Sequence, residues 1–146
     1  MNEAKRYLLD TNILVLLVHA GDLAKSVDRQ YQLRAQPFRP LISVVTVGEA
    51  LKLAMGFGWG LRKREGLTRL LKEFVWVDIN REAVLEAYAE IAHFCESNGI
   101  TVPQNDYWIA ATAQTTQSIL LTTDRHFDAL HGKFLDRIWI DETAAR

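Results

Sequence analysis

Short apolar runs separated by helical patterns constrain the fold of this chain more than any other feature of its sequence. Five such runs are predicted to be strands, and they cover 6–9, 41–44, 75–79, 118–122 and 137–140. Helical patterns fill the intervals, over 13–20, 22–34, 46–55, 61–74, 81–97 and 106–116, with one further short helix near Phe127. Strands that alternate with helices form βαβ units and a parallel sheet. We therefore predict a three-layer α/β fold, with a central parallel sheet of about five strands flanked by helices.

Length and composition favour one soluble globular unit. A chain of 146 residues is typical of a single domain, and we predict one domain over residues 1–146. Hydrophobic residues make up 49% of the chain and charged residues 24%, as is usual for soluble proteins. The formal net charge of −1 argues against a strongly basic nucleic-acid binder but leaves local basic patches open. Cys95 is the single cysteine, which excludes an internal disulfide or a cysteine-rich zinc site and favours a cytoplasmic location.

The apolar segment that ends near Ala20 resembles the core of a signal peptide, since Lys5 and Arg6 precede it. Asp10 and Asn12 interrupt this segment, however, and it is too short to span a bilayer. We therefore predict neither a signal peptide nor a membrane partner.

Four acidic residues are placed where the predicted fold would bring them together. Asp10 and Asp124 follow the first and fourth strands, and Glu49 and Asp106 are predicted to lie in the first turns of helices. In a parallel sheet the carboxyl ends of the strands share one edge, and the ligand crevice lies outside that edge. The sequence therefore predicts that the four carboxylates gather at one rim.

Three of these acids also have simpler explanations. Asp10 and Asp124 could cap the helices that follow them, because aspartate accepts hydrogen bonds from free N–H groups at a helix start. Glu49 stands three residues after Thr46, which is the spacing of a capping box. These alternatives remain open for each residue taken alone.

Asp106 is the acid that a simple cap explains least well. The helix dipole favours an acid in the first turn by roughly 0.3–1 kcal/mol. Asp106, however, heads an otherwise apolar helical stripe of Ile109, Ala110 and Ala113, and burying an unpaired carboxylate costs far more than the dipole returns. Asp106 therefore requires a cation, an arginine or a water-filled cleft beside it.

A cluster of carboxylates limits the chemistry of the site. Two like charges about 4 Å apart repel by roughly 4 kcal/mol at an effective dielectric of 20, so the cluster either takes up protons or binds a cation. Oxygen ligands without cysteine or histidine favour Mg²⁺ or Mn²⁺ over Zn²⁺. Such ions held by acids promote the hydrolysis of phosphodiesters. We therefore predict metal-dependent phosphodiester cleavage.

Each of the four acids lies in a short motif, and the motifs are LLDTNIL at 8–14, SVVTVGEAL at 43–51, NDYWIAATA at 105–113 and LLTTDRHFDAL at 120–130. Together they resemble the motifs of PIN-domain ribonucleases, in particular the VapC-type toxins of type II toxin–antitoxin pairs. The resemblance implies a parallel sheet of about five strands and Mg²⁺- or Mn²⁺-dependent endonucleolytic cleavage of RNA. It also implies an antitoxin partner and a homodimer.

The resemblance assigns a role to each acid. It implies that Asp10 and Asp106 bind the metal directly, and that Asp124 binds a second ion or acts through water. Glu49 would orient the water or the second ion. Two polar residues, Asn12 and Thr122, would support the acids by hydrogen bonds.

The fourth motif departs from the family at one position. Some members carry an acid two residues after the motif's aspartate, whereas this chain has His126. Asp128 could supply a fifth carboxylate only if the turn brought it back, and we predict that it does not. A missing fifth acid would weaken a second metal site without removing the first.

The segment from Lys52 to Lys72 carries six basic residues and the single acid Glu65. It could contact the RNA backbone, with Trp59 available for stacking, or it could be the solvated face of a helix. In the resembled toxins this region also forms a groove for the antitoxin. The candidate RNA contacts are Arg62, Lys63, Arg64, Arg125 and His126.

Two other functions remain as alternatives. The first is a catalytically silent PIN-like module that binds RNA or a partner, although the presence of all four acids argues against it. The second is a phosphotransfer enzyme or receiver domain with Asp10 as the nucleophile. A phosphatase of that kind would require an acid where Asn12 stands.

Overall fold

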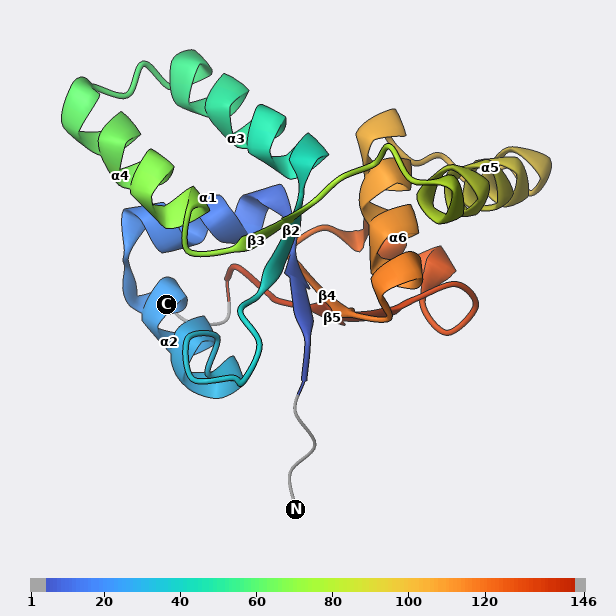
Figure 1. The fold of residues 1–146 in the computed structure, drawn as a ribbon, viewed down its shortest axis with the longest axis horizontal. Coiled ribbons are helices and arrows are strands. Elements are labelled where there is room, and N and C mark those ends of the chain that lie inside the picture. The colour runs from blue at the N-terminus through green and yellow to red at the C-terminus, as the bar shows by residue number, and fades with distance from the viewer. Residues whose placement is uncertain (1–4, 144–146) are drawn as a thin grey trace.

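The computed structural model describes residues 5–143, which form a single five-stranded parallel sheet with helices around it (Figure 1). The strands run in the order β3-β2-β1-β4-β5. Their bounds are β1 Tyr7–Leu9, β2 Leu41–Ser43, β3 Val75–Val77, β4 Ile119–Thr122 and β5 Asp136–Trp139. Every pair of neighbouring strands is parallel, so the predicted parallel sheet is confirmed.

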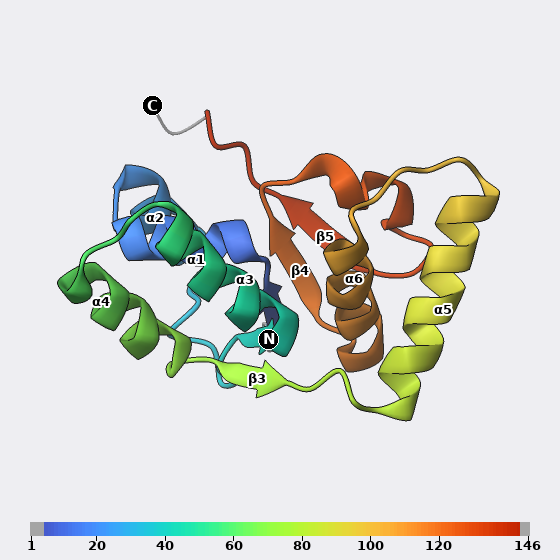
Figure 2. The same cartoon turned by 90° about the horizontal axis from the view of Figure 1, so that it is seen from above.

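The helices lie on both faces of the sheet, and this confirms the predicted three layers. One face carries α1 Thr11–His19, α2 Asp22–Tyr31, α3 Val44–Gly56 and α4 Leu61–Leu71. The other face carries α5 Glu82–Ser97, α6 Gln104–Thr116 and the short 3-10 helix η1 Arg125–Leu130. Figures 1 and 2 show the two groups of helices on opposite sides of the sheet.

Alternation along β1 builds two hydrophobic clusters. Successive side chains of a strand point to opposite faces. Leu8 accordingly packs with α5 and α6, whereas Tyr7 and Leu9 pack with α1 to α4. Both clusters thus hold β1 in place, and with it the residue that follows, Asp10.

The start of α3 differs from the prediction. We expected a capping box between Thr46 and Glu49, but α3 begins at Val44 because the Ser43 hydroxyl accepts a hydrogen bond from the Val45 N–H. Glu49 therefore lies in the second turn of α3, where its side chain is free to reach another element.

Within residues 5–143, no helix combines the length and apolar character needed to cross a bilayer.

Thr46 provides a test of the packing in the first turn of α3. Its side chain is fully buried, and its hydroxyl has no hydrogen-bond partner among the described residues. Thr46→Val keeps the shape and removes the unpaired group, so it should stabilise the fold by about 1 kcal/mol in chemical denaturation. Thr122→Val is the matched control, because the buried Thr122 hydroxyl makes two hydrogen bonds, and this change should destabilise the fold. Equal losses of stability in both variants would contradict the assignment.

Candidate metal and active site

One cavity of about 470 Å³ opens at the carboxyl edge of the sheet, and all four predicted acids line it. Asp10 directly follows β1, and Asp124 lies two residues after β4. The strand order reverses between these two strands, because the chain passes from β1 to β2 on one side and places β4 on the other. Such a switch point is where open α/β sheets bind ligands. The other lining residues are Thr11, Asn12, Lys52, Leu53, Pro103, Gln104, Asn105 and His126.

Asp10 is the most deeply buried of the four acids, with 3% of its surface exposed. It caps α1, since its Oδ1 accepts a hydrogen bond from the Thr11 N–H at 2.8 Å. Its Oδ2 accepts a second bond from the Thr122 hydroxyl at 2.7 Å. Burial, together with the charges of Asp106 and Asp124, raises the pKa of Asp10 to about 7 despite these two hydrogen bonds. Capping and membership of the acidic cluster are therefore both true of this residue.

Asp106 lies in the first turn of α6 and is also buried. Residues 109–113 of the helix are buried with Asp106 between the sheet and α5. Burial raises the pKa of the Asp106 carboxyl, while the hydrogen bond and charge of His126 act in the opposite direction. A hydrogen-bond partner for this carboxyl, His126, is thus within the same chain.

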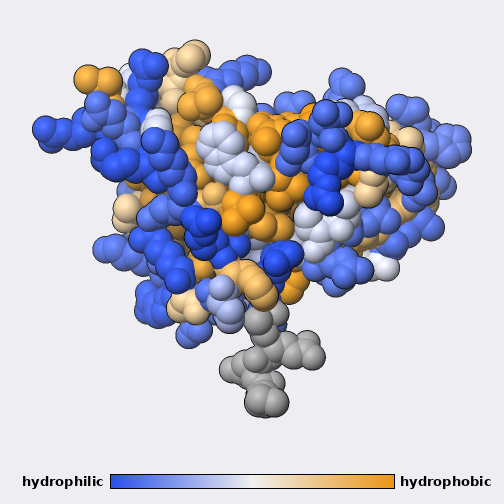
Figure 3. Space-filling model, viewed as in Figure 1, coloured by the Kyte–Doolittle hydropathy of each residue, from blue (hydrophilic) through white to orange (hydrophobic). Residues whose placement is uncertain are grey.

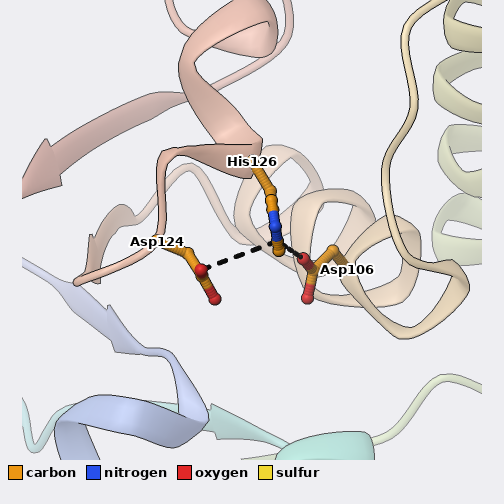
Figure 4. A group of neighbouring side chains, drawn as sticks. All are labelled: Asp106, Asp124 and His126. Atoms are coloured by element: carbon orange, nitrogen blue, oxygen red, sulfur yellow. Dashed lines mark hydrogen bonds and ion pairs between the residues drawn. The ribbon is translucent and has the colours of Figure 1, made fainter.

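His126 points into the acidic cluster (Figure 4). Its Nδ1 lies 2.8 Å from Oδ2 of Asp106 and 3.7 Å from Oδ1 of Asp124. Burial lowers the pKa of the imidazole, but the hydrogen bond to Asp106 and the charges of the three aspartates outweigh it, so the pKa is raised overall. The position that departs from the family pattern therefore contributes a side chain to the centre of the site.

Hydrogen bonds from α1 hold the other two acids. The Thr11 hydroxyl donates to Oε1 of Glu49 at 3.0 Å, and the Asn12 amide donates to Oδ2 of Asp124 at 3.4 Å. The Thr122 hydroxyl, which donates to Asp10, also accepts from the Asp124 N–H at 3.0 Å. These bonds link the first, second and fourth motifs into one network.

Six of the lining residues were not predicted as site residues, and Thr11 and Lys52 are two of them. Thr11 stands between two predicted site residues and begins α1, which was the available signal for its role. Lys52 lies one turn after Glu49 on α3, and its position in the cavity depends on the phase of that helix.

The donor set suits a hard divalent cation. Asp106, Asp124 and His126 each offer one ligand atom, and these atoms lie within 4.8 Å of one another. Asp10 and Glu49 add carboxylates to the same cavity. Carboxylate oxygens are the preferred ligands of Mg²⁺ and Mn²⁺, so the residues present fit such an ion.

The predicted RNA contacts do not form one group. Arg62 and Lys63 line a groove between α1 and α4, whereas Arg64 lies on the opposite side of α4, facing α3. Arg125 stacks on the Trp139 ring at 3.9 Å and pairs with Asp128. Asp128 does not line the acidic cavity.

Comparison with protein families identifies the chain. The family model described as PIN domain matches residues 7–133, which is most of the sequence. The chain belongs to the PIN-domain family. Comparison with curated proteins finds no match.

Solved structures of toxin–antitoxin complexes share the fold. A chain of VapBC2 from Rickettsia felis, bound to a promoter DNA fragment, superposes with a TM-score of 0.77 at 19% identity, covering 91% of this PIN-domain chain and 97% of that one. VapBC-1 from nontypeable Haemophilus influenzae gives 0.72 at 24% identity, with 92% and 97% covered. A toxin–antitoxin complex from Klebsiella pneumoniae gives 0.64 at 25% identity, with 90% and 95% covered. The predicted PIN-like fold and the likeness to VapC-type proteins are confirmed.

The raised pKa of Asp10 predicts a pH-dependent gain of stability in the variant Asp10→Asn. At pH values between 3.8, the ordinary pKa of an aspartate, and about 7, the metal-free folded chain keeps a proton on Asp10 that the unfolded chain has lost. The free energy of unfolding therefore falls as pH rises across this window. An amide at this position does not titrate, so it does not lose stability as pH rises. The free energy of unfolding of Asp10→Asn should therefore exceed that of the parent by on the order of 2 kcal/mol at pH 7 and by little at pH 4.

Urea denaturation in the presence of a chelator, repeated at several pH values, measures this difference. Asp136→Asn, an exposed change at the start of β5, controls for replacing a carboxylate by an amide elsewhere. A stability difference between Asp10→Asn and the parent that stays constant from pH 4 to pH 7 would show that Asp10 is not protonated in the folded chain.

Proposed function

We propose that this chain is a Mg²⁺- or Mn²⁺-dependent endoribonuclease, the toxin of a VapBC-type toxin–antitoxin pair. The observation that carries the proposal is the convergence of Asp10, Glu49, Asp106 and Asp124 on one cavity at the switch point of the sheet. Membership in the PIN-domain family and the fold shared with toxin–antitoxin complexes support it. A single nuclease domain spans the chain.

The acids have separate tasks in this proposal. Asp10, Asp106 and Asp124 hold the divalent ion, which supplies positive charge for the phosphate and lowers the pKa of an attacking water. Glu49 is free to orient that water, because its carboxylate is half-buried at the cavity wall and, within residues 5–143, accepts a hydrogen bond only from the Thr11 hydroxyl. The amide of Asn12 and the hydroxyl of Thr122 fix the carboxylates of Asp124 and Asp10. Lys52, at the rim, is placed to attract the RNA phosphate.

Replacing any one of the acids should remove most RNA cleavage. Asp10→Asn, Glu49→Gln, Asp106→Asn and Asp124→Asn are each expected to lower the rate at least about 100-fold, since each removes charge or orientation at the reacting phosphate. The assay is cleavage of RNA with Mg²⁺, with Mn²⁺ and with a chelator. Glu90→Gln, an exposed change on α5, is the matched control and should cleave like the parent.

The same assay separates the silent alternative. If the chain were a PIN-like module that only binds RNA or a partner, the parent and the variants would either show no cleavage or show the same cleavage with and without metal. That result would remove the nuclease assignment.

We propose that the groove between α1 and α4 binds the RNA backbone. Four basic side chains and one acidic side chain line it: Arg34, Arg62, Lys63, Arg69 and Glu73. It also lies near the acidic cavity, since Val18 lies six positions after Asn12 on α1, or about 9 Å along the helix axis. Trp59 is less available for stacking than predicted, because it is half-buried and Lys63 lies 4.5 Å above its ring.

The groove predicts a change in the salt dependence of RNA binding. The double variant Arg62→Gln/Arg69→Gln should bind single-stranded RNA more weakly. Its slope of log K against log salt should be shallower by about 1.4, at about 0.7 for each phosphate contact. Arg64→Gln, on the opposite side of α4, is the matched control and should leave the slope unchanged. An equal reduction of this slope in both variants would show that the groove does not bind the RNA backbone.

A second surface of α3 and α4 suits the antitoxin. Large apolar side chains are exposed along it, namely Leu51, Met55, Phe57 and Leu61. Figure 3 shows hydrophobic side chains at this end of the molecule beside strongly hydrophilic ones. Exposed apolar patches of this kind mark protein–protein contacts. We propose that an apolar segment of the antitoxin covers them, that the toxin is a homodimer, and that it acts in the cytoplasm.

A further inference from the structure

His126 occupies a position in the site that the mechanism above leaves without a task. Its ring nitrogen is the third member of the group of ligand atoms formed with Asp106 and Asp124. The other three histidines of the chain, His19, His93 and His131, do not line the acidic cavity. A nitrogen donor among carboxylates changes which ion a site prefers.

We propose that Nδ1 of His126 is a direct ligand of the divalent ion and makes the site prefer Mn²⁺ to Mg²⁺. This inference rests on the proposed metal-dependent function of the same cavity. It assigns His126 to the metal rather than to the RNA, which revises our prediction for this residue.

The distances suit adjacent ligands of one ion. At metal–ligand distances of about 2.0–2.3 Å, neighbouring ligands in an octahedral shell lie about 3 Å apart. Nδ1 of His126 is 2.8 Å from Oδ2 of Asp106 and 3.7 Å from Oδ1 of Asp124. A shortening of the distance between His126 and Asp124 from 3.7 Å to about 3 Å, between two partly exposed side chains, would complete this geometry.

The backbone holds the imidazole at the cavity. Asp124 directly precedes η1 without a capping bond from its side chain, and its N–H donates to the Thr122 hydroxyl. Phe127, directly after His126, is fully buried between the sheet and α6. The backbone of His126 is therefore held on both sides, and the direction in which its ring points is set by the start of η1.

Ligand chemistry decides between the two ions. Mg²⁺ binds oxygen ligands almost exclusively, whereas affinity for imidazole nitrogen rises along the series of transition metals that begins with Mn²⁺. An acid at this position, as in some family members, would favour Mg²⁺. The competing account is that His126 acts only as a counter-cation, which the ion displaces from Asp106.

Pulsed electron paramagnetic resonance of the Mn²⁺-loaded protein distinguishes the two accounts. A directly bound imidazole gives a ¹⁴N modulation in the Mn²⁺ signal. We expect this modulation in the parent and in His93→Asn, an exposed change on α5, and its loss in His126→Asn. Bound Mn²⁺ without ¹⁴N modulation in the parent would overturn the proposal and support displacement of His126.

Competition titrations of Mn²⁺ and Mg²⁺ give a second readout that does not depend on catalysis. His126→Asn should bind Mn²⁺ about tenfold more weakly, with a smaller effect on Mg²⁺. His126→Asp should move the preference towards Mg²⁺, and an unchanged ratio in this variant would count against a nitrogen ligand. If the parent and Asp106→Asn bind neither ion, the proposed function itself fails, which is a different outcome from ion binding without nitrogen.

Discussion

Mutual repulsion among buried carboxylates is the constraint on which this structure depends. Asp10 and Asp106 are both buried in one cavity, with Asp124 and Glu49 at its wall. The chain answers part of the repulsion with its own donors, since Thr11 and Thr122 hold Asp10 and His126 holds Asp106. Burial, with the charges of Asp106 and Asp124, also raises the pKa of Asp10 to about 7, so this carboxyl is partly protonated near neutral pH. A fold that keeps its acids in this state has much to gain from binding a divalent cation.

Two hydrophobic clusters make this arrangement rigid. β1 lies at the centre of the sheet, between β2 and β4, and its side chains enter both clusters. The acid that follows β1 is therefore positioned by the whole core. α6 carries Asp106 and is buried along most of its length, so that acid cannot move away from Asp10 towards solvent. The core of this PIN domain thus opposes the electrostatic relaxation that a flexible loop would allow, and preserves a site suited to a cation.

The sequence was sufficient to predict the sheet and the meeting of the four acids, because strand ends in a parallel sheet must share an edge. The sequence was less reliable about where side chains point within turns. Glu49 was expected to bond with Thr46, but the competing Ser43 cap shifted the helix start and freed Glu49 to meet Thr11. The entry of His126 depends on the 3-10 turn of η1, which periodicity does not encode. Charges in one sequence segment also separated onto different faces, as Arg62 and Arg64 show.

Anomalous diffraction from crystals of the protein soaked in Mn²⁺ tests the central claim most directly. The account predicts a peak inside the acidic cavity, about 2.0–2.4 Å from carboxylate oxygens of Asp10, Asp106 and Asp124. No peak at saturating Mn²⁺, with His126 still bonded to Asp106, would contradict the account. It would mean that the chain neutralises its own acids and needs no metal.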